Sequence, residues 1–147
     1  DDQQKGQSSK DTKMTVQQAA GSKIRVLLAD DHRMMREGLR DILEGQPDLV
    51  VVAEVADGRM AVEAVSISRP DVIIMDVNMP KLSGLEATRL IKAEQPHVTI
   101  IGLSVYEDEK TASAMREAGA AAYLTKGGSF EALCATIRKK VAIPRTL

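Results

Sequence analysis

Short aliphatic runs that alternate with helical patterns constrain the fold of this 147-residue chain more than any other feature. The runs are rich in Val, Ile and Leu and are mostly continuous, which is typical of strands buried on both faces. We expect strands at Ile24–Ala29, Leu49–Ala56, Val72–Met75, Thr99–Ser104 and Ala122–Thr125. The chain is long enough for one domain with its own core and too short for two ordinary domains.

Helical patterns fill the intervals between these strands. The expected helices contain the stripe Met35 to Leu43 and the segments Gly58–Ser68, Ser83–Glu94, Glu107–Ala118 and Phe130–Val141. Five strand–helix units in succession predict a doubly wound parallel sheet with helices on both faces. In such sheets, ligands bind beyond the carboxyl ends of the strands.

Composition narrows the function classes. The 20 basic and 21 acidic residues nearly cancel, so no bulk positive field would attract nucleic acid or an anionic membrane. The apolar runs are too short to span a bilayer, and we expect no membrane insertion. A single cysteine, Cys134, fits a reducing compartment, and we expect a cytoplasmic protein.

Polar side chains stand at the ends of four expected strands. Asp30 and Asp31 follow the first strand, Asp76 the third, Ser104 ends the fourth, and Lys126 follows the fifth. An Asp after a strand is usually a turn residue or a helix cap, so each residue alone says little. In a doubly wound sheet, however, these ends share one edge, where the charged groups would converge.

Three carboxylates at one edge require charge compensation. Two of them 4 Å apart repel each other by about 4 kcal/mol at an effective dielectric constant near 20. A bound cation or raised pKa values would relieve this repulsion. The sequence shows no His/Cys cluster for zinc, whereas oxygen ligands and a substrate phosphate suit Mg²⁺. Asp76 is then placed to attack a phosphoryl group as a nucleophile.

These residues resemble a known family. The strand ends LADDH, VIIMDVNMP and AYLTK, with Ser104 between the last two, are similar to the receiver domains of bacterial two-component response regulators. The segments EGLRDIL and AGAAAYLTK most resemble the receivers of helix-turn-helix regulators. The resemblance covers residues 23–141, leaving 1–22 as a flexible leader or linker and 142–147 as a tail. It implies a flavodoxin-like α/β fold with strand order 2-1-3-4-5.

The resemblance also implies roles for the acidic residues. Asp76 would accept a phosphoryl group from a histidine kinase or a phosphotransfer protein. Mg²⁺ would be bound by Asp31, Asp76 and the backbone carbonyl of Asn78, with Asp30 acting through a water molecule.

The remaining positions would form the switch. Ser104 and Lys126 would bind the phosphoryl oxygens, and Tyr123 would turn inward behind Ser104. Asn78 and Tyr106 stand where family members tune the rate of dephosphorylation. The output surface would be the fourth helix, the fifth strand and the fifth helix. Since the Glu107–Ala118 helix has Met115 as its only large apolar residue, we expect it to shift at low energetic cost.

The sequence departs from the family at two positions. Gly127 and Gly128 follow Lys126 where many members have proline, so we expect a more flexible loop. Ser104 replaces the commoner threonine, which keeps the hydroxyl donor but loses the rotamer preference of a β-branched side chain.

Three function hypotheses arise from these residues. We favour a phosphorylation-dependent signalling switch that is not an enzyme acting on external substrates. An aspartyl-phosphate phosphohydrolase is the alternative, but its second acid would stand where this chain has Asn78. A nucleotide-binding domain would need a glycine-rich phosphate loop after the first strand, which the sequence lacks.

The sequence leaves two alternatives for the kind of protein in which this domain acts. It would be either the C-terminal receiver of a hybrid histidine kinase or the receiver of a DNA-binding regulator, with a homodimer as a candidate assembly. The chain itself would not bind nucleic acid. His32 is interpreted as a helix-start residue, His97 as a loop residue and Cys134 as a core residue.

Overall fold

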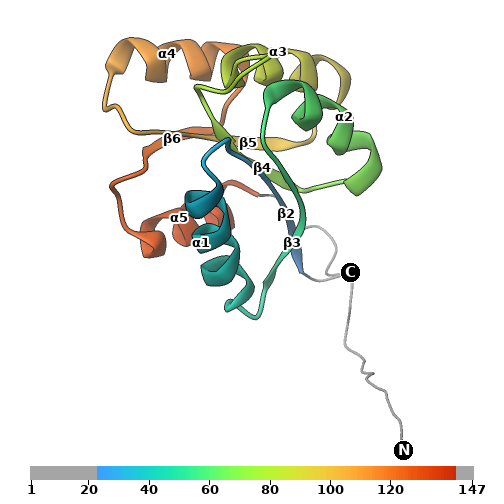
Figure 1. The fold of residues 1–147 in the computed structure, drawn as a ribbon, viewed down its shortest axis with the longest axis vertical. Helices are drawn as coiled ribbons and strands as arrows, with labels where there is room; N and C mark the ends of the chain where they lie inside the picture. The colour runs from blue at the N-terminus through green and yellow to red at the C-terminus, as the bar shows by residue number, and fades with distance from the viewer. Residues whose placement is uncertain (1–22, 142–147) are drawn as a thin grey trace, which may run out of the picture.

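A five-stranded parallel sheet forms the centre of the fold in the computed structural model, which describes residues 23–141 (Figure 1). The strands are β2 (Ile24–Ala29), β3 (Leu49–Val55), β4 (Val72–Asp76), β5 (Thr99–Ser104) and β6 (Ala122–Thr125). Their order is β3-β2-β4-β5-β6, with every neighbouring pair parallel. Counted along the chain this is 2-1-3-4-5, which confirms the predicted flavodoxin-like fold. The expected leader at 1–22 and tail at 142–147 lie outside the described residues.

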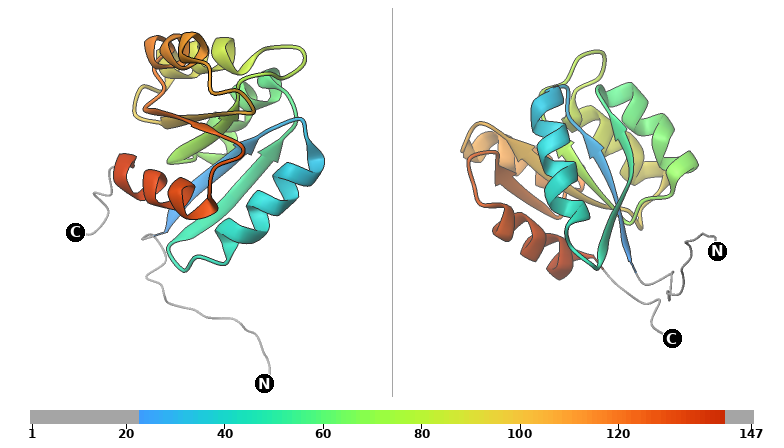
Figure 2. Two further views of the ribbon diagram at one scale, coloured as in Figure 1. Left: turned by 90° about the vertical axis from the view of Figure 1, so that its left-hand side faces the viewer. Right: turned by 60° about the horizontal axis from the view of Figure 1, so that its bottom comes forward.

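Within residues 23–141, five helices cover the two faces of the sheet. They are α1 (Arg33–Glu44), α2 (Gly58–Ser68), α3 (Gly84–Glu94), α4 (Glu109–Ala118) and α5 (Phe130–Lys140). Helices α1 and α5 lie on one face, and α2, α3 and α4 lie on the other (Figures 1 and 2). The sheet is therefore enclosed on both sides, as its continuous apolar strands require.

Capping side chains set the helix starts, and two predicted starts were slightly wrong. Ser83 and Asp108 were expected inside helices, but each is an N-cap residue. The Ser83 hydroxyl accepts the Glu86 N–H at 3.2 Å, and Oδ1 of Asp108 accepts the Lys110 N–H at 3.2 Å. Capping places both residues in extended backbone, so the helices begin only after them.

Alternating strand residues build two separate cores. Leu27, Ile73 and Met75 pack with the residues of α2, α3 and α4. Val26 and Ile74, on the opposite face, pack with residues of α1 and α5. All five residues of β4 are buried, because β4 is the middle strand and carries helices on both sides.

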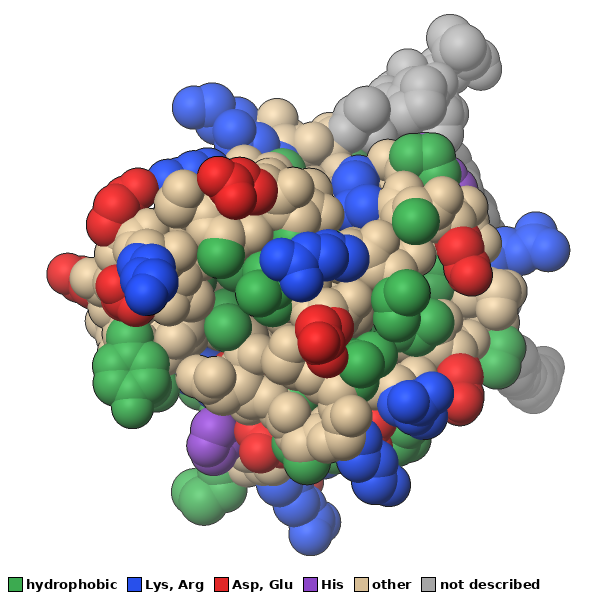
Figure 3. Space-filling model, turned by 90° about the horizontal axis from the view of Figure 1, so that it is seen from above, with side chains coloured by type: hydrophobic (Ala, Val, Ile, Leu, Met, Phe, Trp, Pro, Cys, Tyr) green, Lys and Arg blue, Asp and Glu red, His purple; other side chains and the backbone are tan. Residues whose placement is uncertain are grey.

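The face covered by α2, α3 and α4 is chemically mixed (Figure 3). Met60, Ile67 and Leu90 are exposed, with Ile67 at 82%. Acidic and basic side chains are interspersed with the hydrophobic ones rather than segregated. Within residues 23–141, the structure contains no helix with the length and hydrophobicity needed to cross a membrane.

Candidate functional site

Two buried carboxylates and one ammonium group meet at the carboxyl edge of the sheet. Asp30 follows β2 and Asp76 ends β4, and each residue is 3% exposed. Nζ of Lys126, directly after β6, lies 2.9 Å from Oδ2 of Asp30 and 3.3 Å from Oδ2 of Asp76. Asp31 stands beside them with a side chain that is 34% exposed. The structure thus brings together three of the four polar strand ends noted in the sequence.

Backbone hydrogen bonds hold these residues in place. The Asp30 N–H donates to the Val55 carbonyl at 3.0 Å, and the Lys126 N–H donates to the Ser104 carbonyl at 2.7 Å. The Arg36 guanidinium, which no sequence motif indicated, also donates to the Asp30 carbonyl at 2.7 Å. The sheet ladder therefore extends one residue beyond β2 and beyond β6, and the sheet rather than a free loop positions Asp30 and Lys126.

Burial makes Asp76 an unusual carboxylate. Loss of solvent, and next the negative charge of Asp30, raise its pKa from 3.8 to about 6. The ammonium of Lys126 and the backbone N–H of Asn78, which donates to Oδ1 of Asp76 at 3.3 Å, act in the opposite direction. Asp76 is consequently more basic than a solvated aspartate.

The donor atoms of this edge fit a hard divalent cation. Oδ2 of Asp30 and of Asp76 are both buried, and each meets Lys126 as an ion pair without accepting an aligned hydrogen bond. Asp30, Asp31, His32 and Asp76 each offer a ligand atom, all within 4.8 Å of one another. Buried carboxylate oxygens with free coordinating capacity are the donors that Mg²⁺ prefers.

A close backbone contact fixes the loop after Asp76. A Cβ on Gly84, the first residue of α3, would lie 2.1 Å from the Asp76 carbonyl oxygen. The Gly84 N–H also donates to the Val77 carbonyl at 2.8 Å. Only glycine leaves room for this approach, so the start of α3 is packed directly onto the backbone of the candidate acceptor. Asn78, with an exposed side chain, lies in the loop between them.

The side chains of Ser104 and Tyr123 form their hydrogen bonds with the backbone of the connection after β5. Ser104 is 1% exposed, and its hydroxyl accepts the Tyr106 N–H at 3.2 Å. The Tyr123 hydroxyl donates to the Tyr106 carbonyl at 2.8 Å. The Tyr106 side chain itself is 62% exposed. Both of these predicted switch residues therefore bind the backbone of Tyr106, in the connection between β5 and α4.

The substitution Tyr123→Phe tests whether this bond anchors the β5–α4 connection. We expect a loss of about 0.5–1.5 kcal/mol in the free energy of unfolding, the usual contribution of one hydrogen bond. Amide hydrogen exchange at residues 105–108 should become faster, whereas exchange in β2 should not change. Unaltered exchange at residues 105–108 would show that the hydroxyl does not hold this segment.

The interpretation of His32 as a helix-start residue was incomplete. His32 does occupy the N-cap position of α1, but its side chain makes no capping hydrogen bond. Nδ1 lies instead 3.0 Å from Oδ1 of Asp30, 3.3 Å from Oδ1 of Asp31 and 3.8 Å from Oδ2 of Asp76. The signal available in the sequence was the position of His32 directly after two acids at the predicted site edge.

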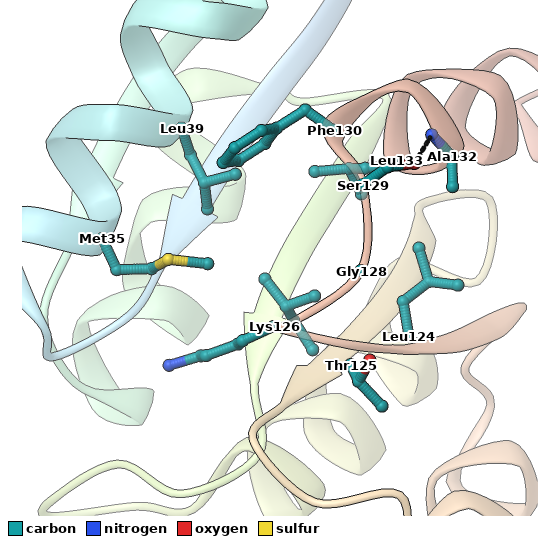
Figure 4. A pocket seen from close by; sticks show the side chains of 11 residues that line it. Met35, Leu39, Leu124, Thr125, Lys126, Gly128, Ser129, Phe130, Ala132 and Leu133 are labelled. Carbon is teal, nitrogen blue, oxygen red and sulfur yellow. Dashed lines mark hydrogen bonds between the residues drawn. The ribbon is translucent and has the colours of Figure 1, made fainter.

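The side chain of Lys126 lines a small, largely apolar pocket between α1 and α5 (Figure 4). The pocket holds about 100 Å³ and is lined by Met35 and Leu39 from α1 and by Phe130 and Leu133 from α5. The amino group of Lys126 points away from α5 in this view. The apolar stem of Lys126 thus borders this pocket, while its charged end pairs with Asp30 and Asp76.

Comparison with known proteins gives a consistent result. Residues 26–138 match the family model of the response regulator receiver domain. The transcriptional regulatory protein DegU of Brevibacillus brevis is 40% identical over 122 residues, which cover 83% of this chain and 52% of DegU. The response regulator UvrY of Escherichia coli is 41% identical over 115 residues, covering 78% of this chain and 53% of UvrY. The chain spans about half the length of these curated relatives.

Solved structures of response regulators have the same fold as this chain. A two-component response regulator of the LuxR family from an Aurantimonas species superimposes with a TM-score of 0.75 at 33% identity, covering 84% of this chain and 91% of that one. The response regulator domain of Thermotoga maritima CheB gives a TM-score of 0.70 at 37% identity, covering 80% of this chain and 92% of that one.

Proposed function

Because the chain belongs to the response regulator receiver domain family, we propose that it is a phosphorylation-dependent switch in which Asp76 accepts a phosphoryl group. Its relatives are signalling proteins rather than enzymes that turn over an external substrate. The observation that carries the proposal is the contact of Asp76 with Lys126, 3.3 Å apart in a buried site beside Asp30.

The geometry supports nucleophilic attack by Asp76. A carboxylate oxygen of Asp76 forms the new O–P bond while the P–N bond of a phosphohistidine on a histidine kinase or phosphotransfer protein breaks. The departing imidazole keeps the bonding electron pair and takes a proton from water. The raised pKa of Asp76 favours the attack, because a more basic oxygen is a better nucleophile. Lys126 remains within reach of the added phosphoryl oxygens and compensates their charge.

The carboxylates of Asp30, Asp31 and Asp76, with the backbone carbonyl of Asn78, would hold Mg²⁺. A bound Mg²⁺ would supply positive charge in addition to that of Lys126 and would offset the charge that develops on the phosphoryl oxygens. The protein contributes the position of these oxygens, which the strand ends fix before any donor arrives. Asn78 at the second position after Asp76 carries an amide, which cannot transfer a proton as the acid of a phosphohydrolase would.

The output surface is formed by α4, β6 and α5. Helix α4 buries only two residues, Ala112 and Met115, so little packing energy opposes its movement. Ser104 and Tyr123 both bind the Tyr106 backbone, directly before α4. A rearrangement of Ser104 toward a phosphoryl oxygen would therefore be transmitted to α4 and to Tyr123.

The relatives favour one of the two contexts. DegU is named a transcriptional regulatory protein, which supports a receiver that controls a DNA-binding regulator. The alternative of a hybrid histidine kinase depended on residues 1–22, which lie outside the described residues. A histidine kinase or phosphotransfer protein would be the partner in either context, and a second copy of the chain is a further candidate.

Intact mass after incubation with acetyl phosphate and Mg²⁺ tests the proposed function. We expect one added phosphoryl group, because the proposal assigns the acceptor role to one residue, Asp76. The product should be labile to hydroxylamine, as acyl phosphates are, and should not form when a chelator removes the metal. A chain that takes up no phosphoryl group, or that rapidly hydrolyses a generic phosphate ester, would contradict the proposal.

A further inference from the structure

The imidazole of His32 has an arrangement that the acceptor chemistry does not require. Its Nδ1 is close to three carboxylates, and it also lies 3.1 Å from Nζ of Lys126. An ammonium group has only donors, so this contact is a hydrogen bond only when Nδ1 carries a lone pair. In that state Nδ1 cannot donate to Oδ1 of Asp30, which lies 3.0 Å away, and with a proton on Nδ1 it can donate to Asp30 but cannot accept from Lys126. No protonation state of Nδ1 therefore satisfies both contacts, whereas a metal ion could be bound by Nδ1 and the carboxylate together.

The distances match those between ligands of one metal ion. Adjacent corners of an octahedron with bonds of 2.0–2.1 Å are about 2.9 Å apart. Nδ1 of His32 lies 3.0 Å from Oδ1 of Asp30 and 3.3 Å from Oδ1 of Asp31. The nitrogen and the two oxygens can therefore occupy neighbouring positions around a common ion with little movement.

The side chain of His32 is not held in this place by the helix it begins. N-cap side chains usually accept a backbone N–H of the first helical turn, and His32 makes no such bond. Its ring is 61% exposed, so little packing directs it. The backbone N–H of His32 donates to Oδ1 of Asp30 at 2.8 Å, which ties the main chain of His32 to the same carboxylate.

We propose that His32 is a nitrogen ligand at this site, so that the site binds borderline divalent metal ions such as Co²⁺ or Ni²⁺ more tightly than Mg²⁺. The inference rests on the metal-assisted acceptor site proposed above and adds a donor to it. Imidazole nitrogen favours the later first-row metals, whereas oxygen ligands alone suit Mg²⁺ and Mn²⁺. The second observation that points to an ion is that the buried Oδ2 atoms of Asp30 and Asp76 share a single ammonium group, that of Lys126, so that two negative charges face one positive charge.

Calorimetric titration of the tag-free chain with CoCl₂ and with MgCl₂ tests this proposal. The variant His32→Phe keeps an aromatic ring but removes the nitrogen donor, and His97→Phe is the matched control at an exposed loop histidine. We expect His32→Phe to weaken Co²⁺ binding about 10- to 100-fold and Mg²⁺ binding by less than about threefold, and His97→Phe to change neither.

Pulsed electron paramagnetic resonance gives a readout independent of affinity. Mn²⁺ added to the unsubstituted chain should show nuclear modulation from one directly bonded ¹⁴N, which His32→Phe should abolish. Absence of this modulation in the unsubstituted chain, or an equal loss of Co²⁺ and Mg²⁺ affinity in His32→Phe, would overturn the nitrogen ligand. Phosphoryl uptake with Mg²⁺ is measured independently of these experiments. The proposal that Asp76 is the acceptor and the proposal that His32 is a ligand can therefore be contradicted separately.

Discussion

The substitution Asp76→Asn is expected to abolish phosphoryl uptake and, in the metal-free protein, to stabilise the fold at neutral pH. Uptake should disappear because an amide is not a nucleophile for phosphorus under these conditions. Stabilisation is expected because the amide that replaces the carboxylate would carry no charge in a buried site that disfavours one. Lys126 keeps a partner in the variant, since Asp30 lies 2.9 Å from its ammonium.

The direction of the pH dependence follows from the raised pKa of Asp76. Its folded-state pKa of about 6 exceeds the ordinary value of 3.8, so the unfolded chain releases this proton more readily. Below about pH 4, the carboxyl group of Asp76 therefore does not lower the free energy of unfolding. As the pH rises toward 6, it lowers this free energy progressively, and above pH 6 the reduction stays constant. The difference in pKa corresponds to at most about 3 kcal/mol.

Chemical denaturation of the metal-free chain between pH 4 and 8 measures this effect. Asp76→Asn should exceed the unsubstituted chain in stability at pH 8 and approach it near pH 4. The control Asp41→Asn removes a carboxylate from the exposed side of α1 and should change stability by less than about 0.5 kcal/mol. Added Mg²⁺ should stabilise the unsubstituted chain more than the variant. A less stable Asp76→Asn at pH 8 would contradict the assigned burial cost.

The substitution Gly84→Ala is expected to lower both the stability of the fold and the rate of phosphoryl transfer to Asp76. The added methyl group would lie 2.1 Å from the Asp76 carbonyl oxygen and 2.9 Å from the Val77 Cα, so backbone must move. Such an overlap should cost about 3 kcal/mol. A displacement of Asp76 by about 1 Å would also slow phosphoryl transfer about 100-fold.

Gly38→Ala provides the matched control for Gly84→Ala. Gly38 lies within α1, and a Cβ built on it meets no atom within 4 Å. This variant should be more stable by about 0.5–1 kcal/mol, because alanine loses less backbone entropy in a helix. Urea denaturation and the initial rate of phosphorylation with acetyl phosphate distinguish the two variants. A Gly84→Ala chain as stable and as reactive as Gly38→Ala would refute the close contact.

Much of the fold was predictable because its signals are local. The runs from Ile24 to Ala29 and from Val72 to Met75 are short and largely aliphatic, as is typical of strands covered on both faces. Helix ends were harder to predict, since Ser83 and Asp108 can either enter a helix or cap it. The structure decides between the two by the hydrogen bonds their side chains accept.

The sequence by itself determined the alternation of strands and helices and the edge at which Asp30, Asp76 and Lys126 would meet. Spacing along the chain is sufficient for both, because parallel strands end on the same side of a sheet. Only the tertiary structure decided the raised pKa of Asp76, the turn of His32 toward the carboxylates and the contact of Gly84 with Asp76. These three properties depend on solvent exclusion and on distances of a few ångströms, which arise when separate segments pack together.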